Sequence, residues 1–145
     1  MTGPSPGIPL EQQPGPVVER MNLYAEARGE GPLGMVGVWW VVEHRAGKHM
    51  TRRADEVLRH AQFSWTADPQ ATRKALNAHR DDPINWAVCD TICTLCELGV
   101  VSDPTGNATH YLNRDACHPE PSWSQPENGW VQTWRHGKHE FGRAA

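Results

Sequence analysis

Two acidic residues near the N-terminus carry the clearest chemical signal in this sequence. Glu26 and Glu30 stand four residues apart in the run Tyr24-Ala25-Glu26-Ala27-Arg28-Gly29-Glu30. A glutamate at the end of a partly buried helix, beside aromatic side chains, can have its pKa raised by desolvation and act as a general acid. Arg28 would oppose that shift if its side chain turned inward. Acidic pairs at this spacing also occur on solvated helix faces, so the spacing alone leaves both interpretations open.

Three cysteines form a second group with a chemically suggestive spacing. Cys89, Cys93 and Cys96 match the spacing of the cluster-binding loop of radical S-adenosylmethionine enzymes. They fall inside an amphipathic helix, however, the chain is too short for the barrel of those enzymes, and no glycine-rich cofactor segment follows. A zinc site that adds Cys117 is another alternative, and so is a disulfide to Cys117 in an oxidising compartment. We favour buried small hydrophobic residues, with no metal and no other cofactor.

The elements that must position Glu26 are helices. Pro16 suits the first turn of a helix and Gly29 suits its end, which places Glu26 in the last turn. The apolar residues between them repeat at helical spacing. A second apolar helix is expected from Leu33 to Gly47. The poor helix formers on it, Gly34 and Gly37, predict the close approach of another backbone.

Further helices are expected over Ala54–His60, over about 69–78, and from Pro83 to a cap at Gly99. The buried stripe of the last of these is predicted to contain Ile84, Val88, Ile92, Leu95 and Leu98. From Ser102 onward Pro, Gly, Asn and Asp recur, which predicts loops with short extended pieces around Thr109–Leu112 and His139–Phe141. The fold class is therefore mainly α, with an irregular, loop-rich C-terminal third.

Composition restricts the function further. A chain of 145 residues is long enough for one domain with a core, and a net charge of −3 argues against nucleic acid as the main ligand. Seven Trp stand against two Tyr and two Phe, and sugar rings stack well on indole faces, although core packing is the alternative for each Trp. No run approaches the roughly 18 apolar residues of a membrane helix, so no membrane insertion is expected.

Four runs of residues carry a family resemblance. Leu23-Tyr24-Ala25-Glu26-Ala27-Arg28-Gly29-Glu30-Gly31, with Gly34-Met35-Val36-Gly37-Val38 after it, resembles the opening motif of the SleB-type cell wall hydrolases, which include spore cortex-lytic enzymes and phage lysins. Three further runs follow in that family's order: Gln62-Phe63-Ser64-Trp65, Asp103-Pro104-Thr105-Gly106-Asn107-Ala108-Thr109-His110-Tyr111-Leu112-Asn113 and Gly137-Lys138-His139-Glu140-Phe141. The resemblance spans roughly residues 19–142.

The resemblance implies a lysozyme-like fold and cleavage of the bond between N-acetylmuramic acid (MurNAc) and N-acetylglucosamine (GlcNAc) in peptidoglycan, with Glu26 as the catalytic acid. Many members are lytic transglycosylases, in which one carboxyl group acts as acid and then as base and leaves a 1,6-anhydro end. This chemistry needs no second carboxylate, and no obvious second acid emerges from the sequence. Glu30 is the second choice for catalysis, or braces the loop after the helix through backbone N–H groups.

The remaining site residues also follow from the resemblance. Tyr111 and Asn113 match positions that would line the cleft, and we expect Tyr111 close to Glu26, with a core aromatic as the alternative. The substrate-binding candidates are Gln62, Ser64, Trp65, Asn113 and His139. A packed turn is the alternative for residues 62–65, and a structural role is the alternative for His139. Trp123 and Trp130, in the loop Cys117–Gln132, are further candidates for sugar contacts.

The expected organisation is a flexible arm at residues 1–15, rich in Pro and Gly, and a catalytic domain at 16–145, acting as a monomer on peptidoglycan glycan strands. Residues 1–16 show no ordinary secretory signal, which favours a phage-encoded lysin that stays cytoplasmic until a holin releases it or a virion carries it. The alternatives are a true muramidase on the same scaffold, or a non-catalytic wall-binding or virion structural module.

Overall fold

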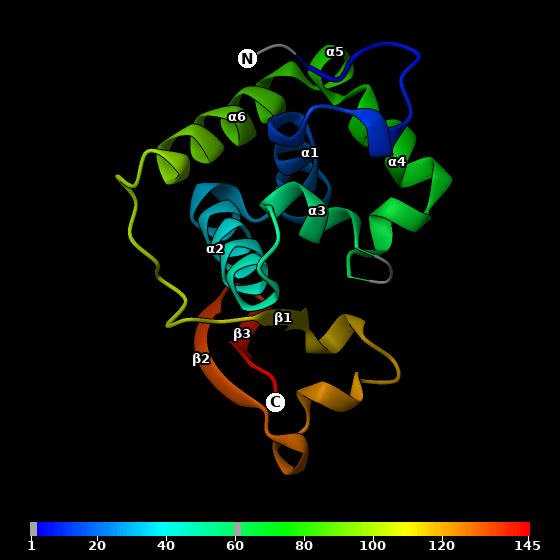
Figure 1. The fold of residues 1–145 in the computed structure, drawn as a ribbon. Coiled ribbons are helices and arrows are strands. Elements are labelled where there is room, and N and C mark those ends of the chain that lie inside the picture. Colours follow the sequence, from blue (N-terminus) through cyan, green and yellow to red (C-terminus); the bar gives the residue numbers. More distant parts are fainter. Residues whose placement is uncertain (1–2, 60–61) are drawn as a thin grey trace.

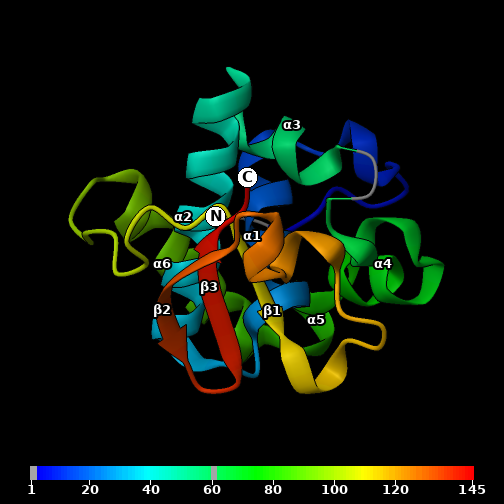
Figure 2. The ribbon, with the colours of Figure 1, turned by 90° about the horizontal axis from the view of Figure 1, so that it is seen from below.

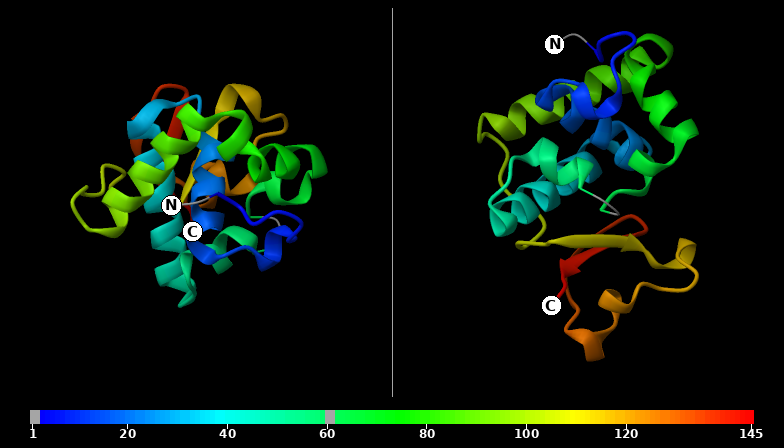
Figure 3. Two further views of the ribbon diagram at one scale, coloured as in Figure 1. Left: turned by 90° about the horizontal axis from the view of Figure 1, so that it is seen from above. Right: turned by 45° about the vertical axis from the view of Figure 1, so that its right-hand side comes forward.

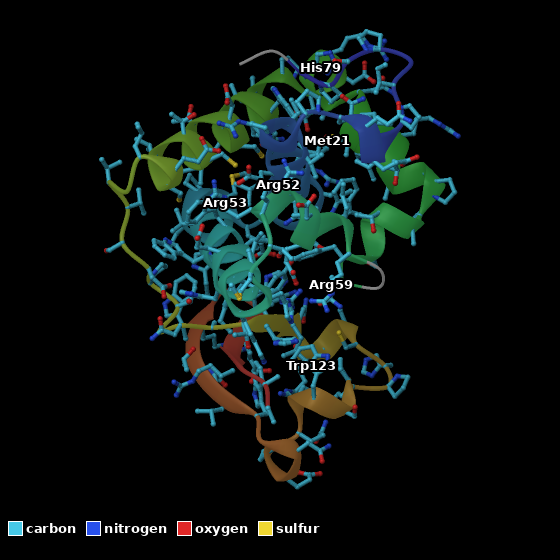
Figure 4. All side chains as sticks on the ribbon, viewed as in Figure 1. Met21, Arg52, Arg53, Arg59, His79 and Trp123 are labelled. Carbon is cyan, nitrogen blue, oxygen red and sulfur yellow. The ribbon has the colours of Figure 1, made fainter. Side chains whose placement is uncertain are left out.

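A central helix, α1 (Gly15–Ala27), organises the helical part of the protein. The structure, a computed structural model, describes residues 3–59 and 62–145. Around α1 lie α2 (Gly31–His49), α3 (Arg53–Leu58), α4 (Pro69–Leu76), α5 (Ala78–Asp81) and α6 (Pro83–Glu97), and the C-terminal sheet lies below them in Figure 1. Because α1 contacts α2, α3, α4 and α6, most of its side chains are buried, including Met21 (Figure 4). The prediction of a mainly helical fold is confirmed.

The limits of α1 agree with the sequence prediction. Pro16 lies in the first turn, where its missing N–H removes no helical hydrogen bond. The helix ends at Ala27, so Glu26 does lie in the last turn. The chain then restarts at Gly31, whose φ of 76° is a left-handed conformation that glycine adopts without steric cost. This short break sends α2 away from α1 and leaves the C-terminal end of α1 facing the sheet.

Three antiparallel strands form the sheet, in the order β1-β3-β2. These are β1 (His110–Asn113), β2 (Val131–His136) and β3 (His139–Arg143), and Figure 2 shows β3 between its two neighbours. Tyr111 of β1 pairs with Phe141 of β3. The extended pieces predicted near β1 and β3 are present, whereas β2 was not predicted. Short 3-10 turns fill much of the segment between β1 and β2, namely Arg114–Ala116, Ser122–Ser124 and Pro126–Asn128.

The glycines of α2 allow the sheet to pack closely on that helix. A Cβ placed on Gly37 would lie 2.8 Å from Cζ3 of Trp134 and 2.9 Å from Cζ of Phe141. A Cβ on Gly34 would lie 2.5 Å from Cβ of Glu30 and 3.3 Å from Cδ2 of His136. The predicted close approach is therefore present, but the neighbours are side chains, mainly aromatic ones of β2 and β3, and not another backbone.

The buried stripe of α6 differs from the one predicted. Ile84 is 78% exposed and Leu98 is 70% exposed, although both were assigned to the core. The buried residues are Trp86, Cys89, Ile92, Cys93 and Cys96. Both sets have helical spacing, and the large indole of Trp86 together with the small thiols fits against α1 and α2 better than the branched chains would. The cysteines are thus core residues.

Residues 3–14, most of the segment predicted as a flexible arm at 1–15, contact the rest of the domain in the structure, and their flexibility stays a prediction. Leu10 is buried, and the Gln13 side chain donates to the backbone oxygens of Ser5 (3.0 Å) and Ile8 (2.7 Å). Gly3 lies against the ring of His79, which Figure 4 labels, and Figure 3 shows the N-terminal segment running over the helical part. One glutamine thus satisfies backbone groups that a Pro-rich segment cannot pair in regular structure. Met1 and Thr2 lie outside the described residues.

The smaller helices follow the prediction with shifted ends. α3 ends at Leu58, and the predicted end at His60 lies outside the described residues. The helical stretch expected over about 69–78 is divided into α4 and α5 at Asn77, whose backbone leaves the helical conformation. Within residues 3–59 and 62–145, no helix is both long and apolar enough to cross a membrane.

Replacing Gly37 with alanine should destabilise the protein by about 1–3 kcal/mol, because the new methyl group has no room between Trp134 and Phe141. Gly47, on the same helix, has no atom within 4 Å of an added Cβ. Gly47→Ala should instead stabilise the protein by about 0.5–1 kcal/mol through helix propensity. Urea unfolding of both variants measures this difference, and equal effects of the two substitutions would contradict the packing described.

Candidate active site

A cleft of about 680 Å³ lies between the helical part and the sheet. It is open to the surface and receives side chains from α1, α2, β1 and the loops around residues 62–64 and 117–123. The described residues that line it are Glu26, Arg45, Gln62, Phe63, Ser64, His110, Tyr111, Leu112, Asn113, Cys117, Pro121, Trp123 and His139. Several of the residues named from the sequence therefore meet in one place.

Glu26 reaches this cleft from the last turn of α1 and is partly buried. Burial raises the pKa of its carboxyl group, because a charged carboxylate loses hydration there. A hydrogen bond from Tyr111 and the positive charge of Arg45 oppose this effect, and burial is the larger of the influences. The carboxyl group therefore holds its proton more tightly than an exposed glutamate, as a general acid requires.

Tyr111 on β1 brings its hydroxyl group to Glu26, as expected from the sequence. Its pKa is raised well above the usual value by burial and by the neighbouring Glu26 charge, so the phenol stays protonated and donates to the carboxylate. The ring is held by Phe141, 5.3 Å away between centroids, and by His139, at 5.6 Å in an edge-on arrangement. The sheet thus fixes the partner of an acid that the helical part supplies.

Arg45 on α2 is a site residue that sequence reasoning missed. The residue is 7% exposed, and its Nε donates to the backbone oxygen of Thr109 at 2.5 Å, just before β1. Its guanidinium carbon lies 5.2 Å from the ring centroid of Phe63. A signal was present, since Val38, Val42 and Arg45 share the buried stripe of α2, where a charged residue is exceptional.

Arg28, in contrast, does not turn toward Glu26. Its Nη1 donates to the backbone oxygens of Tyr24 and Ala25, at 2.9 and 3.4 Å, and its guanidinium lies over the Tyr24 ring. The cation that opposes the raised pKa of Glu26 is therefore Arg45 of α2, not the neighbour in sequence.

The other cleft residues offer polar and aromatic contacts suited to sugars. Gln62, Ser64, Asn113 and His139 all line the cleft, and Oδ1 of Asn113 is buried without a hydrogen-bond partner among the described residues. Trp123 lies in the segment between β1 and β2 (Figure 4). These residues can present hydrogen-bonding groups and an indole face to a glycan strand.

His110 supports this indole from one side. The ring centroid of His110 lies 4.6 Å from that of Trp123, and the ring centroid of Trp130 lies 5.4 Å from that of Trp123. Burial and the nearby cations Arg45 and Lys48 lower the pKa of His110 to about 4, so its ring is neutral near pH 7. A neutral ring packs against the indole without requiring a counter-ion.

Three candidates lie elsewhere than expected, namely Trp65, Glu30 and Trp130, of which Trp130 is 8% exposed and does not line the cleft. Trp65 is 4% exposed and its Nε1 donates to Oδ1 of Asn22 at 2.8 Å, so it belongs to the core and does not line the cleft. Its broad apolar surface explains this burial, and the residue anchors the turn that presents Gln62 and Ser64. Glu30 is also outside the cleft lining.

Glu30 links the helix break to the β2–β3 hairpin. Its Oε1 lies 3.4 Å from Nδ1 of His139, and its backbone oxygen accepts a hydrogen bond from Nε2 of His136 at 2.9 Å. The expected bracing role is thus directed at two histidine side chains and not at backbone N–H groups. Glu30 contacts a residue of the cleft without lining it, which suits support better than catalysis.

The cysteines do not come together. Cys89, Cys93 and Cys96 are buried in α6, and burial raises the pKa of Cys89 to about 12 and that of Cys96 to about 11. Cys117 lines the cleft instead. Among the described residues, no group of three or more His, Cys, Asp or Glu is placed to hold a metal ion. The zinc site that would combine all four cysteines is therefore not formed.

Glu26→Gln should raise the midpoint of thermal unfolding at pH 7. Because burial raises the pKa of Glu26 in the folded state, the folded protein binds a proton more tightly than the unfolded chain, and its stability falls as pH rises through that raised pKa. Glutamine removes this cost. Below about pH 4, where the carboxyl group is protonated in both states, the two proteins should unfold at similar temperatures. Calorimetry across pH 3–8 tests this, and a less stable variant at pH 7 would contradict it.

The comparisons with known proteins agree with the geometry. The model of the cell wall hydrolase family matches residues 29–142, a range that begins just after Glu26. The chain is also similar to the catalytic domain of the germination-specific lytic transglycosylase SleB from Bacillus anthracis, with 22% identity and a TM-score of 0.64, over 96% of this chain and 99% of that chain. The search of curated proteins found no match. The predicted SleB-type fold is confirmed, and the chain belongs to the cell wall hydrolase family, whose enzymes act on peptidoglycan.

Proposed function

We propose that this protein is a lytic transglycosylase that cuts the bond between MurNAc and GlcNAc, with Glu26 as its acid and base. One observation carries the proposal: among the described residues that line the cleft, Glu26 is the only carboxylate. The four residues outside the description, Met1, Thr2, His60 and Ala61, have no carboxyl group in their side chains either. Ordinary glycosidases place two carboxylates on opposite sides of the bond that is cut, so a single one favours a mechanism that uses the same group twice.

In the first step, the protonated Glu26 donates its proton to the glycosidic oxygen. The bond from C1 of MurNAc to that oxygen breaks, and the acetamido oxygen of MurNAc stabilises the positive charge that develops at C1. In the second step, the Glu26 carboxylate removes the proton from the C6 hydroxyl group as this oxygen attacks C1. The product is a 1,6-anhydro end, and Glu26 is protonated again.

The surroundings of Glu26 suit both steps. Burial favours the protonated acid before cleavage, whereas Tyr111 and Arg45 favour the carboxylate that must exist afterwards. The hydrogen bond and the nearby cation thus partly offset the effect of burial on the pKa of Glu26, which stays raised. The proposed reaction uses both forms of the group, first the acid and then the base.

We propose that a holin releases the enzyme or that a virion carries it to the cell wall, as a phage-encoded lysin would require. Attack of water in the second step would make the protein a true muramidase, and the product analysis below distinguishes the two reactions.

Glu26→Gln should lower the rate of peptidoglycan digestion by at least about 100-fold, because general acid–base catalysis typically contributes 10²–10⁴-fold. Glu30→Gln is the matched control, four residues along the chain and outside the cleft lining, and it should keep more than about a tenth of the activity. Loss of turbidity of purified peptidoglycan gives the rates. A fully active Glu26→Gln protein would refute the assignment of Glu26 as the catalytic residue. If the wild-type protein binds peptidoglycan but does not digest it, the protein is a non-catalytic module.

Mass spectrometry of the same digests identifies the reaction. We expect MurNAc ends that lack one water relative to the hydrolysed sugar, which is the signature of a 1,6-anhydro ring. Reducing MurNAc ends without anhydro products would replace the transglycosylase proposal with the muramidase alternative.

Tyr111→Phe should move the alkaline limb of the pH–activity profile to higher pH. The Tyr111 hydrogen bond lowers the pKa of Glu26, so its loss raises that pKa and keeps the acid protonated at higher pH. Tyr24→Phe is the control, because the Tyr24 hydroxyl donates to Oδ2 of Asp82 at 2.9 Å and not to Glu26. Initial rates from pH 4 to 9 measure both profiles. A shift to lower pH for Tyr111→Phe, or equal shifts in both variants, would contradict this role.

A further inference from the structure

Arg45 has hydrogen-bonding capacity that the protein does not use. Its side chain is more than nine-tenths buried and lines the cleft. The other buried residues of α2 are apolar. Nε is committed to the backbone oxygen of Thr109, and Phe63 lies against the guanidinium carbon. Nη1 is buried and has no hydrogen-bond partner among the described residues. A buried donor without a partner is rare in native proteins and calls for an explanation.

A purely structural role accounts for only part of this arrangement. The bond to Thr109 joins α2 to the start of β1, and the contact with Phe63 fixes the guanidinium plane. The bond to Thr109 does not need a full positive charge, which is costly to bury, and the cation–π contact with Phe63 offsets only part of that cost. The described carboxylates that act on Arg45 electrostatically are Glu56 and Glu26. Neither forms a hydrogen bond with Nη1, and Glu56 is bonded instead to His49 and Thr51.

We infer that Arg45 binds the acyl oxygen of the lactyl group that MurNAc, but not GlcNAc, carries on C3, an assignment that rests on the proposed function. Arg45 and Glu26 line the same cleft. The sugar whose C1 is attacked must lie beside Glu26, and its C3 substituent is close to C1 on the same ring. A guanidinium suits a carboxylate or an amide oxygen, and the lactyl group offers the first in peptide-free strands and the second in peptide-bearing strands.

The other acyl group of MurNAc is the less suitable partner. The acetamido oxygen on C2 is the group that stabilises the charge at C1 in the proposed mechanism. A strong hydrogen bond from a cation would withdraw electron density from that oxygen and weaken its assistance. Binding of the lactyl group avoids this conflict, and it also makes the enzyme select MurNAc over GlcNAc at the position where cleavage occurs.

Binding measurements on catalytically inactive protein test the inference. Glu26→Gln protein is titrated calorimetrically with peptide-free peptidoglycan strands, which carry lactyl carboxylates, and with chitohexaose, which has acetamido groups only. Adding Arg45→Gln should weaken binding of the peptidoglycan strands by roughly 10- to 100-fold, as expected for a lost charge-assisted hydrogen bond. Binding of chitohexaose should change by less than about threefold. Equal losses for both ligands, or no loss for either, would overturn the inference.

Two further variants distinguish specific binding by the guanidinium group from a general effect of positive charge. Arg45→Lys keeps the charge but has a single nitrogen, so it should recover only part of the lost affinity for peptidoglycan strands. Lys48→Gln, an exposed cation on the same helix, should leave the preference between the two ligands unchanged. A loss of preference in Lys48→Gln equal to that in Arg45→Gln would point to a general charge effect and contradict specific binding.

A measurement without substitution at Arg45 covers the case in which its variants fail to fold. In Glu26→Gln protein labelled with ¹⁵N-arginine, the Nε–Hε resonance of Arg45 should shift when peptide-free strands are added and should stay in place with chitohexaose. Equal responses to both ligands would contradict the inference. If the protein binds neither ligand and the wild-type protein digests no peptidoglycan, the proposed function itself fails. If the wild-type protein digests peptidoglycan but Arg45→Gln leaves the preference between the two ligands unchanged, only the role of Arg45 is refuted.

Discussion

The close packing of the sheet on α2 is the constraint on which the site depends. Gly37 has no side chain, and the rings of Trp134 and Phe141 occupy the space that a side chain would fill. Phe141 in turn pairs with Tyr111 across the sheet and packs against its ring. The position of the Tyr111 hydroxyl group on β1 therefore depends on the absence of a side chain at Gly37 of α2. A sheet held farther from α2 would separate Tyr111 from Glu26.

The cleft exists because the acid and its partner come from different parts of the fold. The helical part holds Glu26 through α1, whose buried Arg20 bonds Asp90 and Glu97 of α6, each at 2.8 Å. The sheet holds Tyr111, and Arg45 joins the two parts through its bond to Thr109. A rigid helix and a rigid sheet can thus set a hydrogen bond between two functional groups more exactly than loops could.

Sequence reasoning was reliable where local signals determine structure. Pro16 and the glycines after Ala27 define α1, and they place Glu26 correctly in its last turn. The reasoning failed where tertiary packing decides between equivalent patterns. α6 carries two helical stripes, and only the shape of its neighbours selects the one with Trp86 and the cysteines. β2 was not predicted because its residues show little alternation and none of them is fully buried, so pairing with β3 and not its own pattern makes it a strand.

The candidate site shows the same contrast between what local sequence signals predict and what tertiary packing decides. The residues that the sequence assigned by motif meet in the cleft, except Trp65, which its apolar surface draws into the core, and Glu30, which reaches His139 instead. Arg45 belongs to no quoted motif, because its importance arises only when folding buries it beside Glu26. Burial has opposite consequences for these two residues. It favours the uncharged form of Glu26, which suits an acid, but it leaves the permanent charge of Arg45 short of a partner, which suits a receptor for an anionic or acyl oxygen. One buried environment can therefore prepare the proton donor and the group that holds the substrate beside it.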